Sequence, residues 1–281
     1  MLDVLSASCL EAIAYSLKED IAGGDITARL IPEKDIACAQ IVARETAIMA
    51  GQPWATQVFS QVDSRIDCHW LVKEGDRIES NQAIARLEGP ARALVTAERT
   101  ALNWLQTLSG TATAVHAFAA TLAGTSTRLL DTRKTLPGLR LAQKYAVRLG
   151  GGHNHRMGLY DAYLIKENHI AACGSIAAAV NTARLKAPKL LVEVEVESFD
   201  ELAEAIAVEA DIALLDNFAL DDLPQAVKMA RGRLKLEVSG NVTQEALTSI
   251  AQAGVDYVSV GALTKHVRAI DLSMRFKPCP F

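Results

Sequence analysis

The sequence predicts an α/β protein in which a parallel β-sheet is covered by helices, and three observations indicate this fold class. After Gly124, six short apolar runs follow one another, as expected for strands that are buried on both faces. Segments with helical apolar spacing lie between them, and the last three repeats are each about 22 residues long. Polar residues follow nearly every run, which is typical of the carboxyl edge of a parallel sheet that carries an active site.

About the first hundred residues follow a different pattern. Residues 8–20 have the apolar spacing of a helix, and three later segments partly alternate between apolar and polar residues, as strands do. These predicted strands are 36–44, 66–72 and 83–87. The stretch 93–123 is rich in Ala, Leu and Thr, which predicts one long helix or two helices joined near Ser109 and Gly110. We expect a domain boundary in this stretch.

The C-terminal part contains the predicted parallel sheet. Its six strands are expected at 128–130, 162–165, 190–196, 212–215, 234–238 and 257–260. Helical patterns are expected at 176–185, 199–208, 220–230 and 243–253. Six parallel strands can form an open doubly wound sheet or a barrel, and the spacing of apolar residues does not choose between them. Charged residues at almost every strand end favour an enzyme or a ligand-binding protein.

Composition and charge exclude several classes of function. The 281 residues carry a net charge of −4 and lack the basic stripe that sequence-independent nucleic-acid binders usually have. No segment has the uninterrupted apolar length of a membrane span. Residues 1–19 lack the basic segment and apolar run of a signal peptide. We therefore expect a cytoplasmic protein that binds neither nucleic acid nor membranes.

The cysteines give no sign of a disulfide framework. Five of them are scattered singly along the chain, at positions 9, 38, 68, 173 and 279. An odd number without a Cys-x-x-Cys pair fits neither a set of disulfides nor a zinc site. We expect five free thiols in a reducing compartment, and none of them as a nucleophile.

Two groups of cations are candidates for binding an anionic ligand. Next to Thr132, Arg133 supplies a planar fork of hydrogen-bond donors and Lys134 supplies a compact positive charge. The alternative interpretation of this segment is a charged loop exposed to solvent. Lys166 follows a largely apolar run, so its stem is expected inside the sheet. It would either form a Schiff base with a carbonyl substrate or stay charged and bind a carboxylate or phosphate.

The segment 150–156 combines three glycines with His153, Asn154, His155 and Arg156. Glycines let the backbone approach a ligand closely. The two histidines suit zinc, but no third ligand follows at metal-site spacing, and the neighbouring arginine favours an anion. A histidine that only completes the core is the competing interpretation.

Acidic residues are expected at the same edge of the sheet. Glu195 and Asp216 would balance the cations, bind magnesium or face a developing positive charge, and structural ion pairs are the alternative. Alternation along the strand places Glu193, Glu195 and Glu197 on one face, and we select Glu195 for the site. The last two strands end at small residues that could hold a phosphate: Ser239, Gly240, Asn241 and Gly261.

Taken together and in order, these motifs resemble the quinolinate phosphoribosyltransferase family, also called carboxylating nicotinate-nucleotide pyrophosphorylases. The resemblance covers almost the whole chain and rests on the segments 24–27, 98–103, 108–110, 131–138, 151–156, 164–169, 193–196, 214–218, 238–242 and 260–264. It implies an N-terminal α/β sandwich, 1–108, joined by the C-terminal segment 267–281, and an incomplete barrel of about six strands, 109–266. It also implies a homodimer or larger homo-oligomer with shared active sites.

The resemblance implies the reaction and the residues that carry it. Quinolinate and phosphoribosyl pyrophosphate (PRPP) would give nicotinate mononucleotide, pyrophosphate and CO₂, in the biosynthesis of NAD. Magnesium would arrive with PRPP, without a permanent metal or an organic cofactor. The implied residues are Arg99 from a neighbouring subunit, Arg133, His155, Arg156 and Lys166 for the substrate carboxylates, Lys134, Glu195 and Asp216 around the ribose and pyrophosphate, Thr132 in the pocket, and Ser239, Gly240, Asn241 and Gly261 for the 5′-phosphate.

Three alternatives remain open at this point. The pyrophosphorylase-like protein of molybdenum transport operons would share the fold, although the intact motifs 131–138, 154–156 and 166–169 favour the quinolinate enzyme. A Schiff-base aldolase would use Lys166. A small-anion sensor without activity would have no need for the full set of cations and acids.

Overall fold

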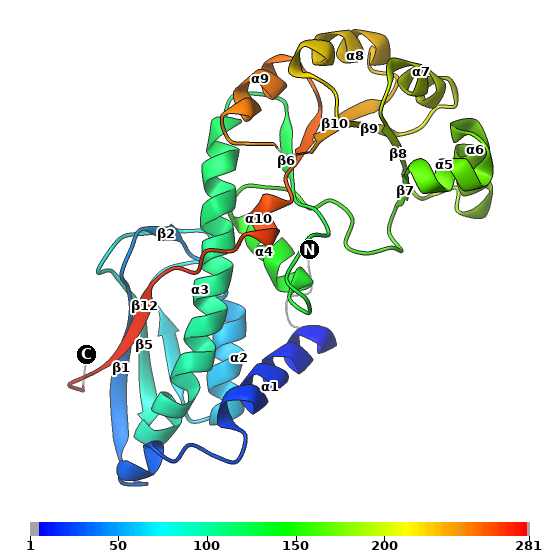
Figure 1. Ribbon diagram of the computed structural model, residues 1–281. Helices are drawn as coiled ribbons and strands as arrows, with labels where there is room; N and C mark the ends of the chain where they lie inside the picture. The colour runs from blue at the N-terminus through cyan, green and yellow to red at the C-terminus, as the bar shows by residue number, and fades with distance from the viewer. Residues whose placement is uncertain (1–5, 241, 280–281) are drawn as a thin grey trace. The chain divides into compact units, whose positions relative to one another are not determined.

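The computed structural model describes residues 6–240 and 242–279, in two compact units (Figure 1). The first unit comprises Met1–His116, Thr135–Gly151 and Leu263–Phe281, and the second comprises Ala117–Lys134 and Gly152–Ala262. The domain bounds expected from the sequence stay a prediction. No helix among the described residues has both the length and the apolar character that crossing a membrane requires.

The first unit contains a four-stranded antiparallel sheet in the order β12–β1–β5–β3. Its strands are β1 (Ile36–Ala43), β3 (Asp67–Trp70), β5 (Ala83–Pro90) and β12 (Leu272–Lys277). Ala39, Ile41 and Ala43 of β1 are buried at alternate positions, as expected for a strand with one face on the core, and Cys38 on the other face is buried as well. The three strands predicted for the N-terminal part are confirmed.

The remaining elements of the first unit are helices and a small second sheet. They are α1 (Ala7–Ile21), the 3₁₀ helix η1 (Ala28–Leu30), α2 (Gln52–Val62), α4 (Arg140–Leu149), β2 (Ala47–Ile48), β4 (Arg77–Ile78) and most of α3 (Ala91–Thr121) and α10 (Ala262–Lys265), whose residues 117–121 and 262 belong to the second unit. The helix predicted at 8–20 is α1, which buries Cys9, Ile13 and Leu17 at helical spacing. The sequence patterns did not predict α2, α4, α10 or the small sheet.

Helix α3 runs without a break through Gly110, so the structure has one long helix in this stretch and not two. A side chain at Gly110 would collide with the backbone carbonyl of Arg268. The chain of the C-terminal segment therefore lies directly against the helix, and the N–H of Ile270 donates to the carbonyl of Gln106 at 3.1 Å. Glycine is present here because two backbones approach each other, which the helical pattern alone does not reveal.

Cys38 on β1 and Cys279, just beyond β12, form a disulfide with Cα atoms 5.7 Å apart. The prediction of five free thiols is therefore wrong for this pair. The two residues are 241 positions apart in sequence, and the pairing of β12 with β1 brings them together. Cys9, Cys68 and Cys173 are free.

The second unit contains a six-stranded parallel sheet in the order β6–β11–β10–β9–β8–β7. Its strands are β6 (Arg128–Leu130), β7 (Tyr163–Ile165), β8 (Val192–Val196), β9 (Ile212–Asp216), β10 (Lys235–Ser239) and β11 (Tyr257–Ser259). All six coincide with the predicted apolar runs. The predicted fold class is confirmed: an antiparallel N-terminal sheet with helices, and an incomplete six-stranded α/β barrel.

Helices cover the outer face of this curved sheet (Figure 1). They are α5 (Glu167–Cys173), α6 (Ile176–Lys186), α7 (Phe199–Ala207), the 3₁₀ helix η2 (Leu220–Asp222), α8 (Leu223–Ala230) and α9 (Ala246–Gln252). Ser175 and Ser198 cap α6 and α7 by accepting the N–H groups of Ala178 and Glu201. The four predicted helices are thus confirmed, whereas α5, directly after β7, was not predicted.

The two edge strands, β6 and β7, do not pair with each other in the described sheet. A loop takes the place beside β6 instead. The N–H of His153 donates to the carbonyl of Leu129 at 2.8 Å, and the N–H of Asp131 donates to the carbonyl of His153 at 3.0 Å. The histidine- and arginine-containing segment is therefore held at the open edge of the sheet.

Candidate active site

The inner face of the curved sheet carries the polar residues because side chains alternate along each strand. On β8, Val192, Val194 and Val196 are fully buried on the helix-covered side. Glu193 and Glu195 therefore lie on the inner face, as predicted. Position 197 lies beyond the end of β8 and is exposed, so the predicted alternation does not extend to it.

A pocket of about 330 Å³ opens at the carboxyl ends of these strands. It is lined by Thr132, Arg133, Lys134, His155, Arg156, Leu164, Lys166, Glu195, Leu214, Glu237, Ser239 and Ser259. Eight of the residues predicted for the site lie in this one pocket although they come from five separate segments of the chain. Convergence of this kind is typical of the catalytic edge of a parallel α/β sheet.

The other predicted residues occupy different places. A Cβ atom at Gly261 would lie 2.8 Å from Cδ of Lys134, and one at Gly240 would lie 3.5 Å from Oδ1 of Asp216. Gly261 is thus against a pocket residue, and Gly240 and Asp216 are adjacent to each other. Arg99 is exposed on α3 in the first unit, and Asn241 lies outside the described residues.

Asp131 anchors the loop that contains the two histidines. Its side chain is fully buried. Oδ1 accepts the N–H of His155 at 2.9 Å, and Oδ2 accepts the side-chain amide of Asn154 at 2.7 Å. A carboxylate that accepts two such hydrogen bonds holds the loop in one conformation. Downstream, Asp161 accepts the N–H of Met157 at 2.6 Å, which fixes the other end of this loop.

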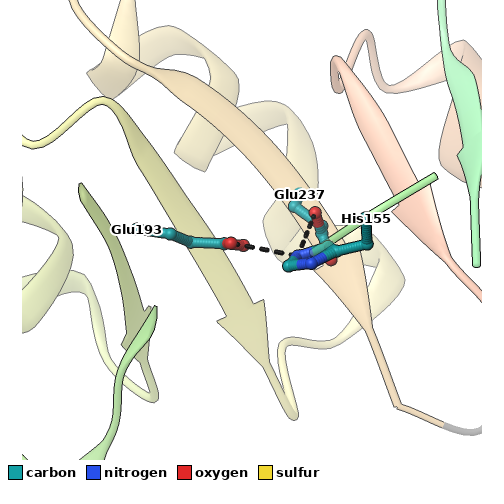
Figure 2. Close-up of side chains that lie close together, drawn as sticks. All are labelled: His155, Glu193 and Glu237. Carbon is teal, nitrogen blue, oxygen red and sulfur yellow. Dashed lines mark ion pairs between the residues drawn. The ribbon is translucent and has the colours of Figure 1, made fainter. Parts of the chain in front are cut away.

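His155 lies between two buried glutamates, one from β8 and one from β10 (Figure 2). Its Nε2 is 3.0 Å from Oε2 of Glu193 and 3.5 Å from Oε2 of Glu237. Its Nδ1 accepts the backbone N–H of Arg156 at 2.7 Å. An atom that accepts a hydrogen bond at this distance has no proton of its own, so we place the ring proton on Nε2, facing the carboxylates.

The pKa values of His155 and Glu237 are displaced from their ordinary range. Burial lowers the pKa of His155, but the hydrogen bond to Glu193 and the charges of both glutamates outweigh it, and the net pKa is raised. Burial and the charge of Glu193 raise the pKa of Glu237 to about 8. The imidazole and the nearby hydroxyl of Ser259 lower it by less. A raised His155 pKa favours a second ring proton, but Nδ1 is occupied by the hydrogen bond from the N–H of Arg156, so the ring carries its proton on Nε2.

The cluster of His155, Glu193 and Glu237 has the composition of a metal site, with ligand atoms within 4.8 Å of one another. Its hydrogen bonds do not suit one. A histidine that binds a metal through Nε2 carries its proton on Nδ1 and donates it to an acceptor. Here Nδ1 faces the N–H donor of Arg156, so the proton belongs on the atom that would need a free lone pair. The donor set therefore fits a proton and not a metal ion.

Lys166 lies at the junction of β7 and α5, where its Nζ forms an ion pair with Oε2 of Glu195. Its backbone N–H donates to Nδ1 of His169 at 3.0 Å, which fixes the start of α5. The side chain of Lys166 is partly exposed, and that of Glu195 is mostly buried. The partnership suits a charged ammonium group, whereas a Schiff-base lysine reacts as a neutral amine.

The prediction from sequence did not include Glu237, Ser259 or the anchoring role of Asp131. Glu237 and Ser259 lie on the inner face of β10 and β11, inside runs that were interpreted only as apolar strands. A glutamate within such a run, Leu236-Glu237-Val238, was the available signal, because an unpaired acid is rarely buried. The same alternation that places Glu195 on the inner face of β8 places Glu237 on the inner face of β10.

The chain matches two family models of known proteins. The model described as quinolinate phosphoribosyl transferase, C-terminal domain, matches residues 111–275, and the N-terminal domain model matches residues 25–109. A probable nicotinate-nucleotide pyrophosphorylase (carboxylating) of Bacillus subtilis is 43% identical over 257 residues, which cover 91% of this chain and 89% of the relative. The corresponding Mycobacterium leprae protein is 42% identical over 272 residues, covering 94% and 95%.

Solved structures agree with these sequence matches. The nicotinate-nucleotide pyrophosphorylase from Francisella tularensis superposes with a TM-score of 0.94 at 50% identity and covers 96% of each chain. The NadC structure from Streptococcus pyogenes has a TM-score of 0.92 at 38% identity and covers 95% of this chain and 96% of that one. Since both family models and full-length relatives match, this chain belongs to the quinolinate phosphoribosyltransferase family.

Proposed function

We propose that this protein transfers the phosphoribosyl group of PRPP to the ring nitrogen of quinolinate and releases pyrophosphate and CO₂. The product is nicotinate mononucleotide, a precursor of NAD. The observation that carries this proposal is the gathering of Arg133, Lys134, Arg156 and Lys166 in one pocket of a protein whose net charge is −4. So many cations in one pocket favour an anionic ligand, and quinolinate and PRPP together supply carboxylates and phosphates.

Arg133, Arg156 and Lys166 are proposed to bind the two carboxylates of quinolinate. Burial and the neighbouring charge of Arg133 lower the pKa of Arg156, which indicates that the pocket brings two guanidinium groups together at a cost. The Nε atom of Arg156 is buried and has no hydrogen-bond partner among the described residues. A carboxylate between the arginines would relieve their repulsion and accept hydrogen bonds in the fork geometry that arginine favours.

We place three residues around the reacting ribose: Lys134, Glu195 and Asp216. The 5′-phosphate is proposed to bind at Ser239, Gly240, Asn241 and Gly261. Thr132 is proposed to line the same pocket. Departure of pyrophosphate breaks the C1–O bond and leaves an oxocarbenium-like carbon, which the pyridine nitrogen attacks. The acids on β8 and β9 would stabilise the positive charge that develops there. The pyridinium nitrogen then accepts electron density as the adjacent carboxylate leaves as CO₂, and that carbon takes up a proton.

Magnesium is proposed to enter with the pyrophosphate of PRPP. The residues present fit such an ion, because Glu195 and Asp216 supply the hard oxygen ligands that it prefers. One carboxylate oxygen of Glu195 is already paired with Lys166, so these residues would complete the coordination of a substrate-bound ion and not form a full cage. When bound, magnesium would neutralise charge on the leaving pyrophosphate.

The chain is also proposed to act as a homodimer or larger homo-oligomer in the cytoplasm, with Arg99 completing the pocket of a neighbouring subunit. The exposure of Arg99 on α3 leaves it available for such a contact. These statements remain predictions, which sedimentation and cell fractionation test.

The reaction is tested by supplying quinolinate, PRPP and magnesium and measuring nicotinate mononucleotide and CO₂. The proposal predicts equal amounts of the two products. Formation of the nucleotide from nicotinate instead, or no product at all from folded protein, would contradict it. Borohydride added with substrate should leave Lys166 unmodified in mass spectra, whereas an aldolase would trap a covalent adduct there.

A further inference from the structure

Two cavities of the second unit meet at His155. One is the pocket described above, and the other, of about 330 Å³, includes the first residues of several strands, among them Arg128 and Tyr257. His155, Arg156 and Glu237 line both cavities. His155 and Glu237 therefore lie between the two cavities, and Glu193, which lines the second cavity, pairs with His155 (Figure 2).

Both nitrogen atoms of the His155 ring are engaged by the protein itself. Nε2 faces the two glutamates, and Nδ1 accepts the N–H of Arg156. Neither nitrogen therefore offers an unused donor for a substrate carboxylate. A histidine held in this way acts on its neighbours through orientation.

The glutamate pair lacks donors of its own. Oε1 of Glu193 and both oxygens of Glu237 are buried without a well-aligned hydrogen bond, and the donors near Glu237 are the imidazole of His155, at 3.5 Å, and the hydroxyl of Ser259. Unmatched buried acceptors are costly, and two carboxylates side by side repel each other. A proton on the fully buried Glu237 removes both problems, because the neutral acid has an O–H group to donate and carries no charge.

We propose that Glu237, in its neutral form, and Glu193 are positioning residues that act through His155 to place Arg156 for the substrate carboxylate. The inference rests on the proposed function. The glutamates fix the plane of the imidazole, and Nδ1 of the ring fixes the N–H of Arg156. Asp131 holds the preceding N–H, that of His155, at 2.9 Å. The backbone on both sides of this peptide is thus determined, and with it the starting point of the Arg156 side chain.

Loss of the glutamate contacts would let the imidazole turn. Its Nδ1 would then leave the Arg156 N–H without an acceptor, and the guanidinium would no longer have a defined position in the pocket. Quinolinate contacts Arg156 in the proposed function, whereas PRPP is placed on other residues. The inference therefore predicts a selective loss of quinolinate binding.

The test compares Glu237→Gln with Glu237→Leu in full-length protein. Glutamine keeps the shape and neutrality of the protonated acid, so its Michaelis constants should stay within about threefold of the parent enzyme. Leucine keeps the volume but removes the polar contact. It should raise KM for quinolinate at least about tenfold while KM for PRPP changes less than about threefold. Glu74→Gln is the matched control, because Glu74 is a partly buried acid of the first unit whose pKa is also raised by burial, and its replacement should change thermal stability without changing either constant.

A second pair of variants keeps the inference testable if Glu237→Leu does not fold. Asparagine at position 155 retains an acceptor near the Nδ1 position, whereas glutamine places its amide near Nε2. His155→Asn should therefore keep a lower KM for quinolinate than His155→Gln does. If the imidazole itself bound the substrate, both variants would lose quinolinate binding equally.

Unchanged KM for quinolinate in folded Glu237→Leu, or a parallel rise of both constants, would overturn the inference. So would equal defects in the two His155 variants. In each case the parent enzyme would still form nicotinate mononucleotide, so failure of the inference is separate from failure of the proposed function.

Discussion

Replacing Gly261 by alanine should disable the enzyme by moving Lys134, without unfolding the protein. The added Cβ would lie 2.8 Å from Cδ of Lys134 and 3.4 Å from Oγ1 of Thr132. Carbon atoms in contact normally lie about 3.5–4.0 Å apart, so the lysine must shift by roughly 1 Å. The backbone of Gly261 lies outside the left-handed region, so alanine fits it without strain.

A displacement of this size at a reacting group can reduce the rate by about 10²-fold. We therefore expect kcat/KM for PRPP to fall about 10- to 100-fold, which is about 1.4–2.7 kcal/mol of transition-state stabilisation. Steady-state kinetics measure the loss, and the melting temperature should change by only a few degrees. Gly23→Ala is the matched control, because a Cβ there meets no atom within 4 Å.

A double-mutant cycle with Lys134→Ala tests the reasoning itself. If Gly261 acts through Lys134, then adding Gly261→Ala to Lys134→Ala should cause little further loss, since the displaced group is already absent. An equal loss in both backgrounds would refute the explanation, because it would show that the methyl group disturbs something other than the lysine.

The raised pKa of Glu237 means that the folded protein keeps a proton that the unfolded chain loses above pH 4.5, so stability falls as the pH rises from about 4.5 to about 8. Glu237→Gln should remove this fall. The unfolding free energy of the variant minus that of the wild type, measured with urea, should therefore rise by a few kcal/mol between pH 5 and pH 8, at about 1.4 kcal/mol per pKa unit. A difference between the two proteins that does not change with pH would contradict the proton assigned to Glu237. Cys279→Ser should lower stability by about 2–4 kcal/mol in oxidising buffer and by nothing once a reductant has opened the disulfide to Cys38, and equal losses in both buffers would show that the bond does not contribute. Mixed oligomers of Arg99→Ala and Lys134→Ala subunits should be more active than either parent, since some pockets receive both intact residues; mixed oligomers no more active than the parents would exclude a shared site.

Much of the second unit follows from local pattern in the sequence. Six continuous apolar runs separated by helical segments defined the parallel sheet, because strands buried on both faces need apolar residues throughout. The order of polar groups at strand ends predicts that Lys134, Lys166 and Glu195 lie together, and in the structure they line one pocket. Local patterns in the sequence were therefore sufficient to predict the strands of this sheet and the residues at their ends.

Features that depend on contacts between distant segments were not predictable in this way. The Cys38–Cys279 disulfide requires β12 to lie beside β1, and Gly110 is explained only by the backbone of Arg268 against the helix. The environment of the His155 side chain also depends on contacts between distant segments. It needs one acid from β8, one from β10 and the anchor at Asp131, none of which is close in sequence.

The ratio of kcat/KM for quinolinate to that for nicotinate tests the central claim most directly. Nicotinate lacks one carboxylate, so Arg133, Arg156 and Lys166 would be left with fewer anionic partners than they can satisfy. Sites that pair buried polar groups with a substrate reject analogues lacking the partner by about 10⁴ or more. With PRPP and magnesium saturating, we expect quinolinate to be preferred by at least about this factor. Comparable values for the two acids would contradict the assignment of this pocket to a dicarboxylate.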